Sequence, residues 1–459
     1  MTDQQSRRAF LKRSAALGVA GVATPFVTSL AAIGEAAAAT ATDYKAMVCV
    51  FLYGGNDYAN TLPPYDQASY AQYLAARANI AHNREALAAT LLTPSAALPG
   101  GRQYALAPTM TSLLPLFDQG KLAVVLNVGT LVQPTTKAQY TANTVRLPPK
   151  LFSHNDQQSY FQASNPEGAT SGWGGRIGDL FQSGNGSATL TCINTSGNAV
   201  YLTGKSAVQY SVGSGGPVAL LNNAASLYGS PAAAGTLRSL MTAPATHVFA
   251  NEHARISKRA LDTYAQVNGA LAGAPAAGFP LFPAGNSLAD QLKIVARMIS
   301  VSADLGAKRQ VFFVSLGGFD LHDNLVAQHP GLMAKVSDAM RAFYDTTVAL
   351  GVQDKVTSFT ASDFGRTLQS NDDGSDHGWG SMHFVLGGAV QGRKFYGTPP
   401  AIGNGTADDV GQGRLLPTIS VDQYAATLSS WFGVSTGDLT TVLPNMGNYT
   451  PSSWNLGFV

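Results

Sequence analysis

Residues 355–388 read KVTSFTASDFGRTLQSNDDGSDHGWGSMHFVLGG and place a polar loop between two apolar runs. The runs Val356–Thr360 and Phe384–Leu386 are short and bounded by turn residues, which is typical of buried strands. Open α/β sheets bind ligands at the carboxyl ends of their strands, so the loop is predicted to belong to a site. The alternative is a polar loop whose Asp and His residues only cap and hydrogen-bond.

The chain before this stretch predicts a parallel sheet. Ser287–Leu305 has apolar residues at helical spacing, and Arg309–Leu316 reads as a buried strand. Lys335–Leu350 is predicted to be a helix that leads into the strand at Lys355–Thr360. A strand, a helix and a second strand with a short return form a βαβ unit, whose strands are parallel.

Acidic residues follow three predicted strands at their carboxyl ends. The strand at 45–53 ends in Gly-Gly-Asn and Asp57, the strand at 309–316 is followed by Asp320 and His322, and the strand at 355–360 by Asp363. If the first strand is parallel to the other two, these side chains lie at one edge of the sheet. The sequence therefore predicts that they converge.

The predicted site combines four carboxylates with three imidazoles. Its members are Asp57, Asp320, His322, Asp363, Asp376, His377 and His383. This mixture of oxygen and nitrogen ligands suits Zn, Mn or Mg, and gathered carboxylates need a compensating cation. Two divalent ions about 4 Å apart can clamp the attacking and leaving oxygens of phosphoryl or sulfuryl transfer. In an alternative arrangement, Asp376 or His383 orients His377 instead of binding metal.

Catalytic groups are predicted beside these ligands. Ser153 is placed to cap a helix, and the N–H groups at a helix N-terminus favour an anion. Ser153 is the candidate nucleophile and His154 the second candidate, while a plain helix cap is the alternative. Arg366 is expected to pair with anionic ester oxygens, or else to form a structural salt bridge with Asp363.

The N-terminal segment has the features of an export signal. Ser6–Lys12, SRRAFLK, matches the twin-arginine consensus, and a weakly apolar segment at 15–33 precedes small residues at 36–39. Residues 1–39 are therefore predicted to be a signal peptide, with the twin-arginine translocase as a partner during export. The mature chain is expected to be periplasmic or secreted.

The composition of the remaining chain excludes several classes of protein. Residues 40–459 contain 25 basic and 25 acidic residues, so no basic footprint for nucleic acid remains. No later apolar stretch is long enough to anchor the chain in a bilayer. The hydrophobic fraction of 45% predicts a sizeable core. Cys49 and Cys192 lie in strand-like apolar surroundings and are expected to be free and buried, with a disulfide as the alternative.

The chain after the predicted signal peptide is expected to form one domain. Helices are predicted at 68–92, 109–119, 173–181 and 247–271, and a second strand at 122–128. Residues 183–235 are rich in Gly, Ser, Asn and Ala and are predicted to form an inserted subdomain within the domain at 40–459.

Several short motifs, taken in order, resemble the DUF1501 family. After the twin-arginine start they are GGND (54–57), FSH (152–154), GGFDLH (317–322), SDFGRT (362–367) and DHGWG (376–380). That family consists of exported bacterial proteins related to the alkaline phosphatase/sulfatase superfamily. The resemblance implies an alkaline phosphatase-like α/β fold, with a central mostly parallel sheet flanked by helices.

The resemblance also implies roles for single residues. Asp57 resembles the first metal-binding Asp of the superfamily, and Ser153 or His154 falls at the position of its nucleophile. Asp320 and His322 resemble its Asp and His ligand pair, with one residue between them where the phosphatases have three.

Two further positions resemble later ligands of the superfamily. Asp363 resembles the Asp of the later Asp-His pair, but Phe364 stands where that His would be. His377, or else His383, resembles the final His ligand. The expected activity is metal-dependent hydrolysis of a small anionic phosphate or sulfate ester. The alternative, favoured by Phe364, is a non-catalytic envelope protein that keeps the fold for binding or assembly.

Overall fold

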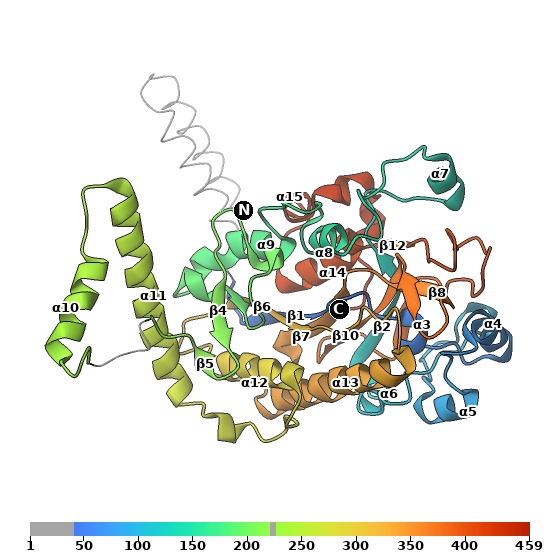
Figure 1. The fold of residues 1–459 in the computed structure, drawn as a ribbon, viewed down its shortest axis with the longest axis horizontal. Helices are drawn as coiled ribbons and strands as arrows, with labels where there is room; N and C mark the ends of the chain where they lie inside the picture. Colours follow the sequence, from blue (N-terminus) through green and yellow to red (C-terminus); the bar gives the residue numbers. More distant parts are fainter. Residues whose placement is uncertain (1–40, 221–225) are drawn as a thin grey trace, which may run out of the picture.

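A computed structural model describes residues 41–220 and 226–459, and the predicted signal peptide lies outside these residues. A ten-stranded sheet runs through the centre of the molecule (Figure 1). In spatial order its strands are β11 (Lys394–Tyr396), β2 (Leu122–Gly129), β10 (Ser381–Gly387), β7 (Val356–Ser362), β1 (Lys45–Leu52), β6 (Arg309–Leu316), β3 (Cys192–Asn194), β4 (Tyr210–Gly213) and β5 (Gly216–Pro217), and β12 (Ile419–Ser420) pairs with β2.

The central strands of the sheet are parallel to one another. β1 lies between β6 and β7 and is parallel to both, and β3 is parallel to β6. β10 is antiparallel to both of its neighbours, β7 and β2. Leu52 pairs with Leu316 and with Ser362, so β1, β6 and β7 end at the same level. The predicted α/β fold with a mostly parallel central sheet is confirmed, and so is the predicted alignment of these three strand ends.

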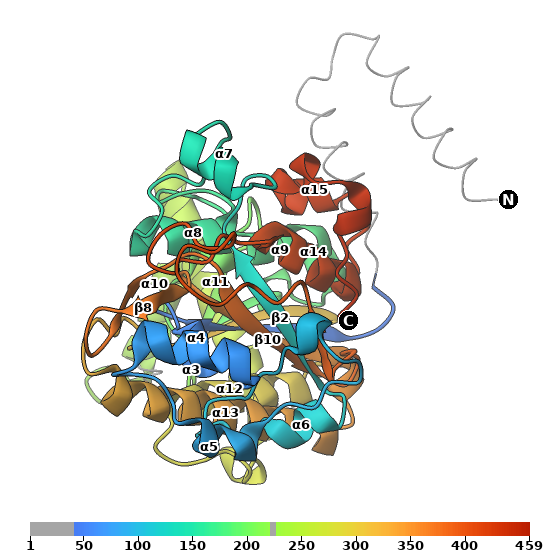
Figure 2. The ribbon, with the colours of Figure 1, turned by 90° about the vertical axis from the view of Figure 1, so that its right-hand side faces the viewer.

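Helices cover both faces of the sheet because its central strands are apolar on both faces. In β1, Val48 and Val50 join the core on one face, while Cys49 and Phe51 join the core on the other. The first core includes α6 (Leu114–Asp118), α12 (Ser287–Ser300) and α13 (Leu325–Ala349). The second includes α8 (His154–Ala163), α9 (Trp173–Phe181) and α14 (Val421–Phe432). Figures 1 and 2 show the two helical layers on opposite sides of the sheet.

Some predicted helices differ from the observed ones. The single helix expected at 68–92 is divided into α4 (Gln67–Arg77), α5 (Arg84–Leu87) and a 3₁₀ turn at Ala88–Thr90. The division follows from Asn83, whose side chain accepts from the backbone N–H of Glu85 and starts a new helix. α13 begins ten residues before the expected start, and α6 covers only the second half of the helix expected at 109–119.

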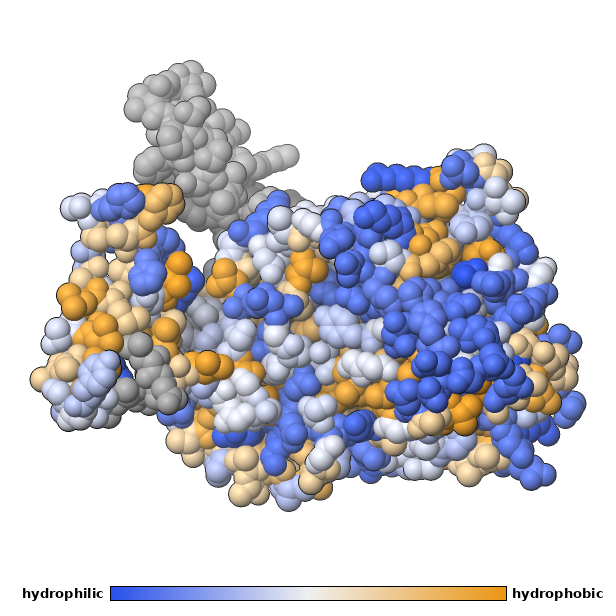
Figure 3. Space-filling model, viewed as in Figure 1, coloured by the Kyte–Doolittle hydropathy of each residue, from blue (hydrophilic) through white to orange (hydrophobic). Residues whose placement is uncertain are grey.

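The segment at 183–235 extends the central sheet. Its strands β3 and β4 pair in parallel, and β3 also pairs with β6. An inserted subdomain with these boundaries stays a prediction. After it, α10 (Pro231–Thr242) and α11 (Val248–Ala272) form a hairpin at the side of the molecule (Figure 1). Leu240 and Phe249 are exposed there, and Figure 3 shows hydrophobic residues in orange on this side of the molecule.

The remaining elements lie around the sheet. They are α3 (Tyr58–Thr61), α7 (Lys137–Ala142), α15 (Leu439–Val442) and the two-stranded sheet of β8 (Arg366–Ser370) and β9 (Ser375–His377). Cys49 and Cys192 are free and buried, as expected. Every helix in residues 41–220 and 226–459 is too short or too polar to cross a bilayer.

Candidate functional site

The site lies where the loops after β1, β6 and β7 meet. Gly54 follows β1 with φ +116°, and a Cβ there would stand 2.3 Å from the backbone nitrogen of Asp320. Gly55 has φ +80°, and a Cβ on it would stand 2.5 Å from the Phe364 ring. Only glycine allows both the left-handed backbone and this close approach. The two glycines therefore let the first loop pack directly against the other two.

Three imidazoles surround the carboxylate of Asp320. Nε2 of His154 lies 3.4 Å from Asp320 Oδ2. Nε2 of His322 and Nε2 of His377 lie 3.1 Å and 3.2 Å from Asp320 Oδ1. His154 begins α8, His322 follows β6 and His377 ends β9, so three separate elements supply the rings. We call these four residues the Asp320 cluster.

The other ring nitrogen of each imidazole is already held by an oxygen. Nδ1 lies 2.7 Å from Asp363 Oδ2 in His154, 3.1 Å from Asp376 Oδ1 in His322 and 2.7 Å from the Phe152 carbonyl in His377. A carbonyl or carboxylate oxygen accepts a hydrogen bond from Nδ1–H, and in the neutral ring the lone pair is then on Nε2. Metal-binding histidines are usually oriented in this way, with the second nitrogen donating to an oxygen.

The donor atoms of the cluster fit a divalent cation. One atom each from His154, Asp320 and His377 lies within 4.8 Å of the others, an arrangement that could hold a metal ion. Nε2 of His154 is buried and has no hydrogen-bond partner. Nε2 of His322 and Nε2 of His377 are 2.9 Å apart, so two lone pairs face each other unless a proton or a cation lies between them. Imidazole nitrogens and a carboxylate oxygen suit zinc in particular.

Neighbouring charges set the protonation of these groups. The hydrogen bond to Asp363 raises the pKa of His154. Burial lowers the pKa of His377. Burial alone would raise the pKa of Asp320, but the hydrogen bond and positive charge of Arg366 outweigh it and lower that pKa. Asp320 is therefore ionised at neutral pH and available as a ligand.

Asp363 lies behind His154 rather than at the centre of the cluster. Its Oδ2 accepts from His154, from Gln158 Nε2 at 2.8 Å and from the backbone nitrogen of Gly54 at 3.1 Å. Its Oδ1 is buried without a hydrogen-bond partner. Asp376 likewise lies behind His322, and not behind His377 as the alternative reading had proposed.

Arg366 holds the site together from inside. Its side chain is 1% exposed, and Nη1 donates to Asp320 Oδ1 at 2.7 Å and to the carbonyl of Gly54 at 3.2 Å. The rest of the guanidinium contacts Ser375. The alternative prediction of a structural salt bridge is confirmed, but its partner is Asp320 rather than Asp363, and contact of Arg366 with ester oxygens stays a prediction.

Asp57 is not part of the cluster, contrary to the prediction. It is 1% exposed and pairs with Arg77 through two hydrogen bonds of 3.0 Å and 2.5 Å. It also accepts from Ser375 Oγ at 2.7 Å and from the backbone nitrogen of Asn60 at 2.9 Å, which makes it the N-cap of α3. Burial would raise its pKa, but Arg77 lowers it well below the usual range. The carboxylate already has a cation, so it needs no metal.

His383 is also placed away from the cluster. It lies on β10 between the rings of Phe161 and Tyr424, and Nδ1 is 3.4 Å from Thr360 Oγ1. Burial lowers its pKa to about 3, so it is neutral in the folded chain. The position of His383 before an apolar run does not reveal the face of the strand on which its side chain lies, so the sequence could not exclude it as a ligand.

The two candidate nucleophiles occupy different environments. Ser153 is the N-cap residue of α8, and its Oγ donates to Asp156 Oδ2 at 3.0 Å. His154, the next residue, is the one that contacts Asp363 and lies against Asp320. A catalytic role for Ser153 stays a prediction.

Sequence reasoning missed two residues that support the site. Gln158 donates to Asp363, and its position four residues after His154 on the same helix face was a usable signal. Arg77 neutralises Asp57 from α4, and nothing in the spacing of the motifs pointed to it. Phe364 packs against the rings of His154 and His377, with centroids 4.8 Å and 4.7 Å away. It thus fills the position that the resemblance assigns to a histidine.

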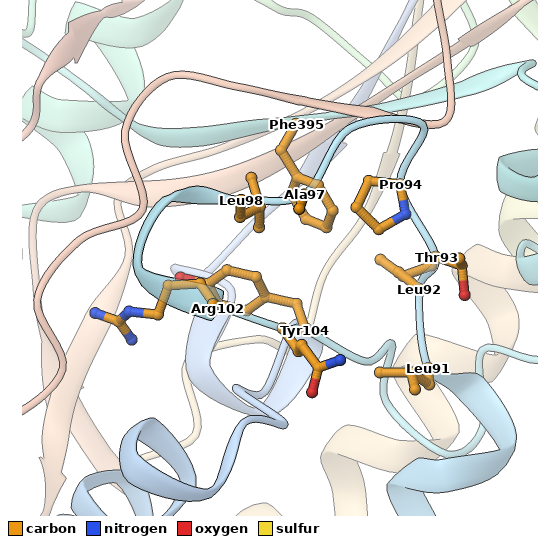
Figure 4. Close-up of a pocket in the computed structure, with 11 residues that line it drawn as sticks. Leu91, Leu92, Thr93, Pro94, Ala97, Leu98, Arg102, Tyr104 and Phe395 are labelled. Atoms are coloured by element: carbon orange, nitrogen blue, oxygen red, sulfur yellow. The ribbon is translucent and has the colours of Figure 1, made fainter.

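A separate pocket lies away from this chemistry. It has a volume of about 270 Å³, and the aromatic rings of Tyr104 and Phe395 and the side chains of Leu92 and Leu98 line it (Figure 4). None of the residues of the Asp320 cluster lines this pocket.

Solved structures with similar backbones include enzymes of several kinds. A lipoteichoic acid synthase from Listeria monocytogenes matches with 9% identity and a TM-score of 0.35 over 93% of this chain and 81% of its own. A lipooligosaccharide phosphoethanolamine transferase from Neisseria meningitidis matches with 9% identity and a TM-score of 0.35 over 100% and 69%. An alkaline phosphatase from the Antarctic bacterium TAB5 matches with 9% identity and a TM-score of 0.28 over 77% and 95%. With TM-scores below 0.5, these similarities carry no argument about activity.

No curated protein matches the chain. The family model described as protein of unknown function (DUF1501) matches residues 44–440, which include every residue of the Asp320 cluster. That match covers most of the chain and agrees with the motifs recognised in the sequence. The chain belongs to the DUF1501 family.

Proposed function

We propose that the Asp320 cluster binds a divalent cation and that the protein hydrolyses phosphate or sulfate esters with it. One observation carries the proposal. Three Nε2 atoms lie around one carboxylate, and an oxygen behind each ring holds Nδ1. Such a set is hard to explain as capping, because a loop cap needs one acceptor and not three oriented imidazoles.

The residues have separable tasks in this proposal. His154, Asp320 and His377 would hold the cation, with His322 as the fourth ligand. Arg366 fixes Asp320, Asp363 fixes His154, and Asp376 fixes His322. A bound divalent cation polarises an ester oxygen and makes a bound water more acidic.

Access to the cluster supports a reaction with a soluble ester. The side chains of Asp320 and His322 are both 45% exposed, so one side of the cluster faces solvent. The anionic group of a small ester can therefore reach the cation without any movement of the core. Ser153 adjoins His154 and stays the predicted nucleophile, with direct attack by water as the alternative.

Hydrolysis assays test the proposal directly. The chain without residues 1–39 is purified, stripped with a chelator, and loaded with Zn, Mn or Mg. Turnover of aryl phosphates, phosphodiesters or aryl sulfates with one of these metals, lost in His377→Ala, is the expected result. Ser153→Ala distinguishes attack by the Ser153 hydroxyl from direct attack by water. Turnover should be lost in this variant if a covalent intermediate forms on the hydroxyl, and should be kept if water attacks directly.

A non-catalytic binding protein is the second candidate. Phe364 favours it, because its ring occupies the position of a further ligand between His154 and His377. Metal binding without turnover of any of these esters would support this second candidate over the first.

We also propose that the protein leaves the cytoplasm by the twin-arginine route. The support is the sequence around Arg7 and Arg8, together with the small residues up to Ala39. Replacing both arginines by lysine is expected to leave the full-length precursor in the cytoplasm. Normal processing and export of that variant would contradict this proposal.

A further inference from the structure

A polar pocket lies along α8, directly beside the Asp320 cluster. Its volume is about 280 Å³. Asn155, Gln158, Ser159 and Gln162 line it from α8, and their spacing places them on one face of the helix. Tyr53, which follows β1, lines it as well. Phe161 packs in the core from another face of α8, whereas Asn155 is exposed and Gln158 and Ser159 are half-buried, so this row is the polar face of the helix.

The pocket and the cluster share a structural link. Gln158 lines the pocket, and its Nε2 donates to Asp363 Oδ2 at 2.8 Å. The same Asp363 oxygen accepts from Nδ1 of His154 at 2.7 Å. Asn155 directly follows His154 on α8. A molecule bound at the cluster therefore has the pocket as its immediate neighbour.

The lining of the pocket is hydrogen-bonding but almost uncharged. Amides of Asn and Gln both donate and accept, which matches the dual character of hydroxyl groups. Asn198 contributes a further amide from outside α8, and both Asn155 and Asn198 are exposed. The Asn155 amide nitrogen lies 3.5 Å from Glu167 Oε1, a long contact that a ligand hydroxyl can replace. Glu167 is the one charged residue in the lining, and no lysine or arginine lines the pocket.

The carboxylate of Glu167 and the ring of Tyr53 indicate which chemical class of ligand fits the pocket. A phosphate or sulfate would meet the Glu167 carboxylate without a compensating cation, so an anionic group is disfavoured in the pocket. Tyr53 is only half-buried, and its ring packs against Phe51 at 4.5 Å between centroids, so a rigid aromatic face borders the pocket. A neutral group with many hydroxyls and one apolar C–H face meets all of these features, and that group is a sugar ring.

We propose that this pocket binds the sugar part of a carbohydrate phosphate or sulfate ester whose anionic group lies at the Asp320 cluster. The proposal rests on the proposed hydrolase function and adds the substrate class. The pocket would supply hydrogen bonds to sugar hydroxyls from Asn155 and Asn198, while Tyr53 packs against the ring.

The first test compares two kinds of ester in the metal-loaded protein. We measure kcat/KM for hexose 6-phosphates and 6-sulfates and for 4-nitrophenyl phosphate and sulfate. In Asn155→Ala/Asn198→Ala, the ratio of sugar-ester to aryl-ester kcat/KM should fall by about 10-fold, as expected for the loss of two hydrogen bonds. Asn251→Ala, a matched change on the exposed face of α11, should leave that ratio as in the wild type. An unchanged ratio in the double variant would overturn the proposal.

The second test does not depend on catalysis. Saturation-transfer NMR measures the binding of methyl glucoside, methyl galactoside and methyl mannoside to the wild type. The same three sugars are then measured with the Asn155→Ala/Asn198→Ala double variant. Sugar signals in the wild type that weaken in the double variant support the pocket even if no ester is hydrolysed, in which case only the hydrolase function fails. Absence of sugar signals in a protein that does hydrolyse aryl esters would overturn the sugar pocket and leave the hydrolase function intact.

Discussion

Asp57 and Asp320 follow neighbouring parallel strands, yet their carboxylates differ in burial and in the side chains that contact them. Asp57 is buried and bound by both terminal guanidinium nitrogens of Arg77, Nη1 and Nη2. Asp320 is partly exposed, and beside its one contact with Arg366 it faces three imidazoles. The two carboxylates are even connected, because Ser375 donates to Asp57 and contacts the guanidinium of Arg366.

The contacts around a strand-end carboxylate decide whether it is a structural group or a candidate ligand. Arg77 contacts both oxygens of the buried Asp57 carboxylate, which leaves no place for a metal there. Asp320 is more exposed, Arg366 contacts only its Oδ1, and three imidazole nitrogens lie around it, with the other nitrogen of each ring held by an oxygen. A metal is therefore expected at the second carboxylate and not at the first.

The largest loss of metal affinity is expected when the shared carboxylate is removed. Asp320→Asn takes away the one anionic group that all three Nε2 atoms face, so zinc affinity should fall by at least about 100-fold. Competition with a fluorescent chelator measures this affinity, and circular dichroism checks that the fold is kept. Wild-type zinc affinity in a folded Asp320→Asn protein would exclude the cluster as the metal site.

A smaller loss of affinity should follow from loosening one imidazole. Asp363→Asn leaves an amide where the carboxylate accepts from His154, so the ring is less well oriented and less basic. Supporting groups of this kind typically contribute about 10- to 100-fold to metal affinity. The same chelator titration applies, and Gln158→Ala should show a weaker effect in the same direction because it removes only one of the donors to Asp363.

Breaking the Asp57 pair should affect stability and not metal affinity. Arg77→Met leaves a buried carboxylate without its counter-ion, which typically costs about 3–5 kcal/mol of unfolding free energy. Urea unfolding measures the loss, and Asp57→Asn added to Arg77→Met should restore part of it. A gain of zinc affinity in Arg77→Met would show that Asp57 can act as a ligand, and would contradict its assignment as a purely structural group.

Replacing His383 is expected to have the smallest effect on zinc affinity, but it should change how the stability of the fold depends on pH. Its folded pKa of about 3 lies below its unfolded value near 6.5, so the unfolded chain binds a proton that the folded chain does not. The stability of the wild type should therefore fall, relative to His383→Phe, by about 1.4 kcal/mol per pH unit below pH 6.5. Unfolding curves from pH 7 to pH 5 measure this difference, while zinc affinity should be the same in both proteins. A difference in stability that does not change with pH would mean that the pKa of His383 is the same in the folded and unfolded chains.

The sequence was sufficient for the framework of the fold. The strand at Arg309–Leu316 was predicted with its observed bounds and the helix at Trp173 with its observed start, because apolar runs and regular periodicity mark such elements strongly. The parallel direction of the strands at 309–316 and 355–360 followed from the βαβ pattern, which placed Asp320 and Asp363 at one edge, whereas the direction of the strand at 45–53 was only assumed.

The site was only half predictable, since side-chain partners depend on distant parts of the chain. His322 and His377 were recognised from their motifs, and the structure brings both to Asp320. Arg77 lies on α4, and no local pattern shows that a helix residue will neutralise Asp57. His154 was weighed as a second nucleophile, but its contact with Asp363 depends on how α8 docks beside β7.

Location of a bound metal tests the central claim most directly. Crystals of the mature chain are soaked with zinc, and anomalous scattering is recorded at the zinc absorption edge. We expect a peak between Asp320 and the Nε2 atoms of His154 and His377, with zinc–nitrogen distances of about 2.0–2.1 Å. A peak at Asp57, or the absence of any peak at the Asp320 cluster with zinc in excess, would contradict the account.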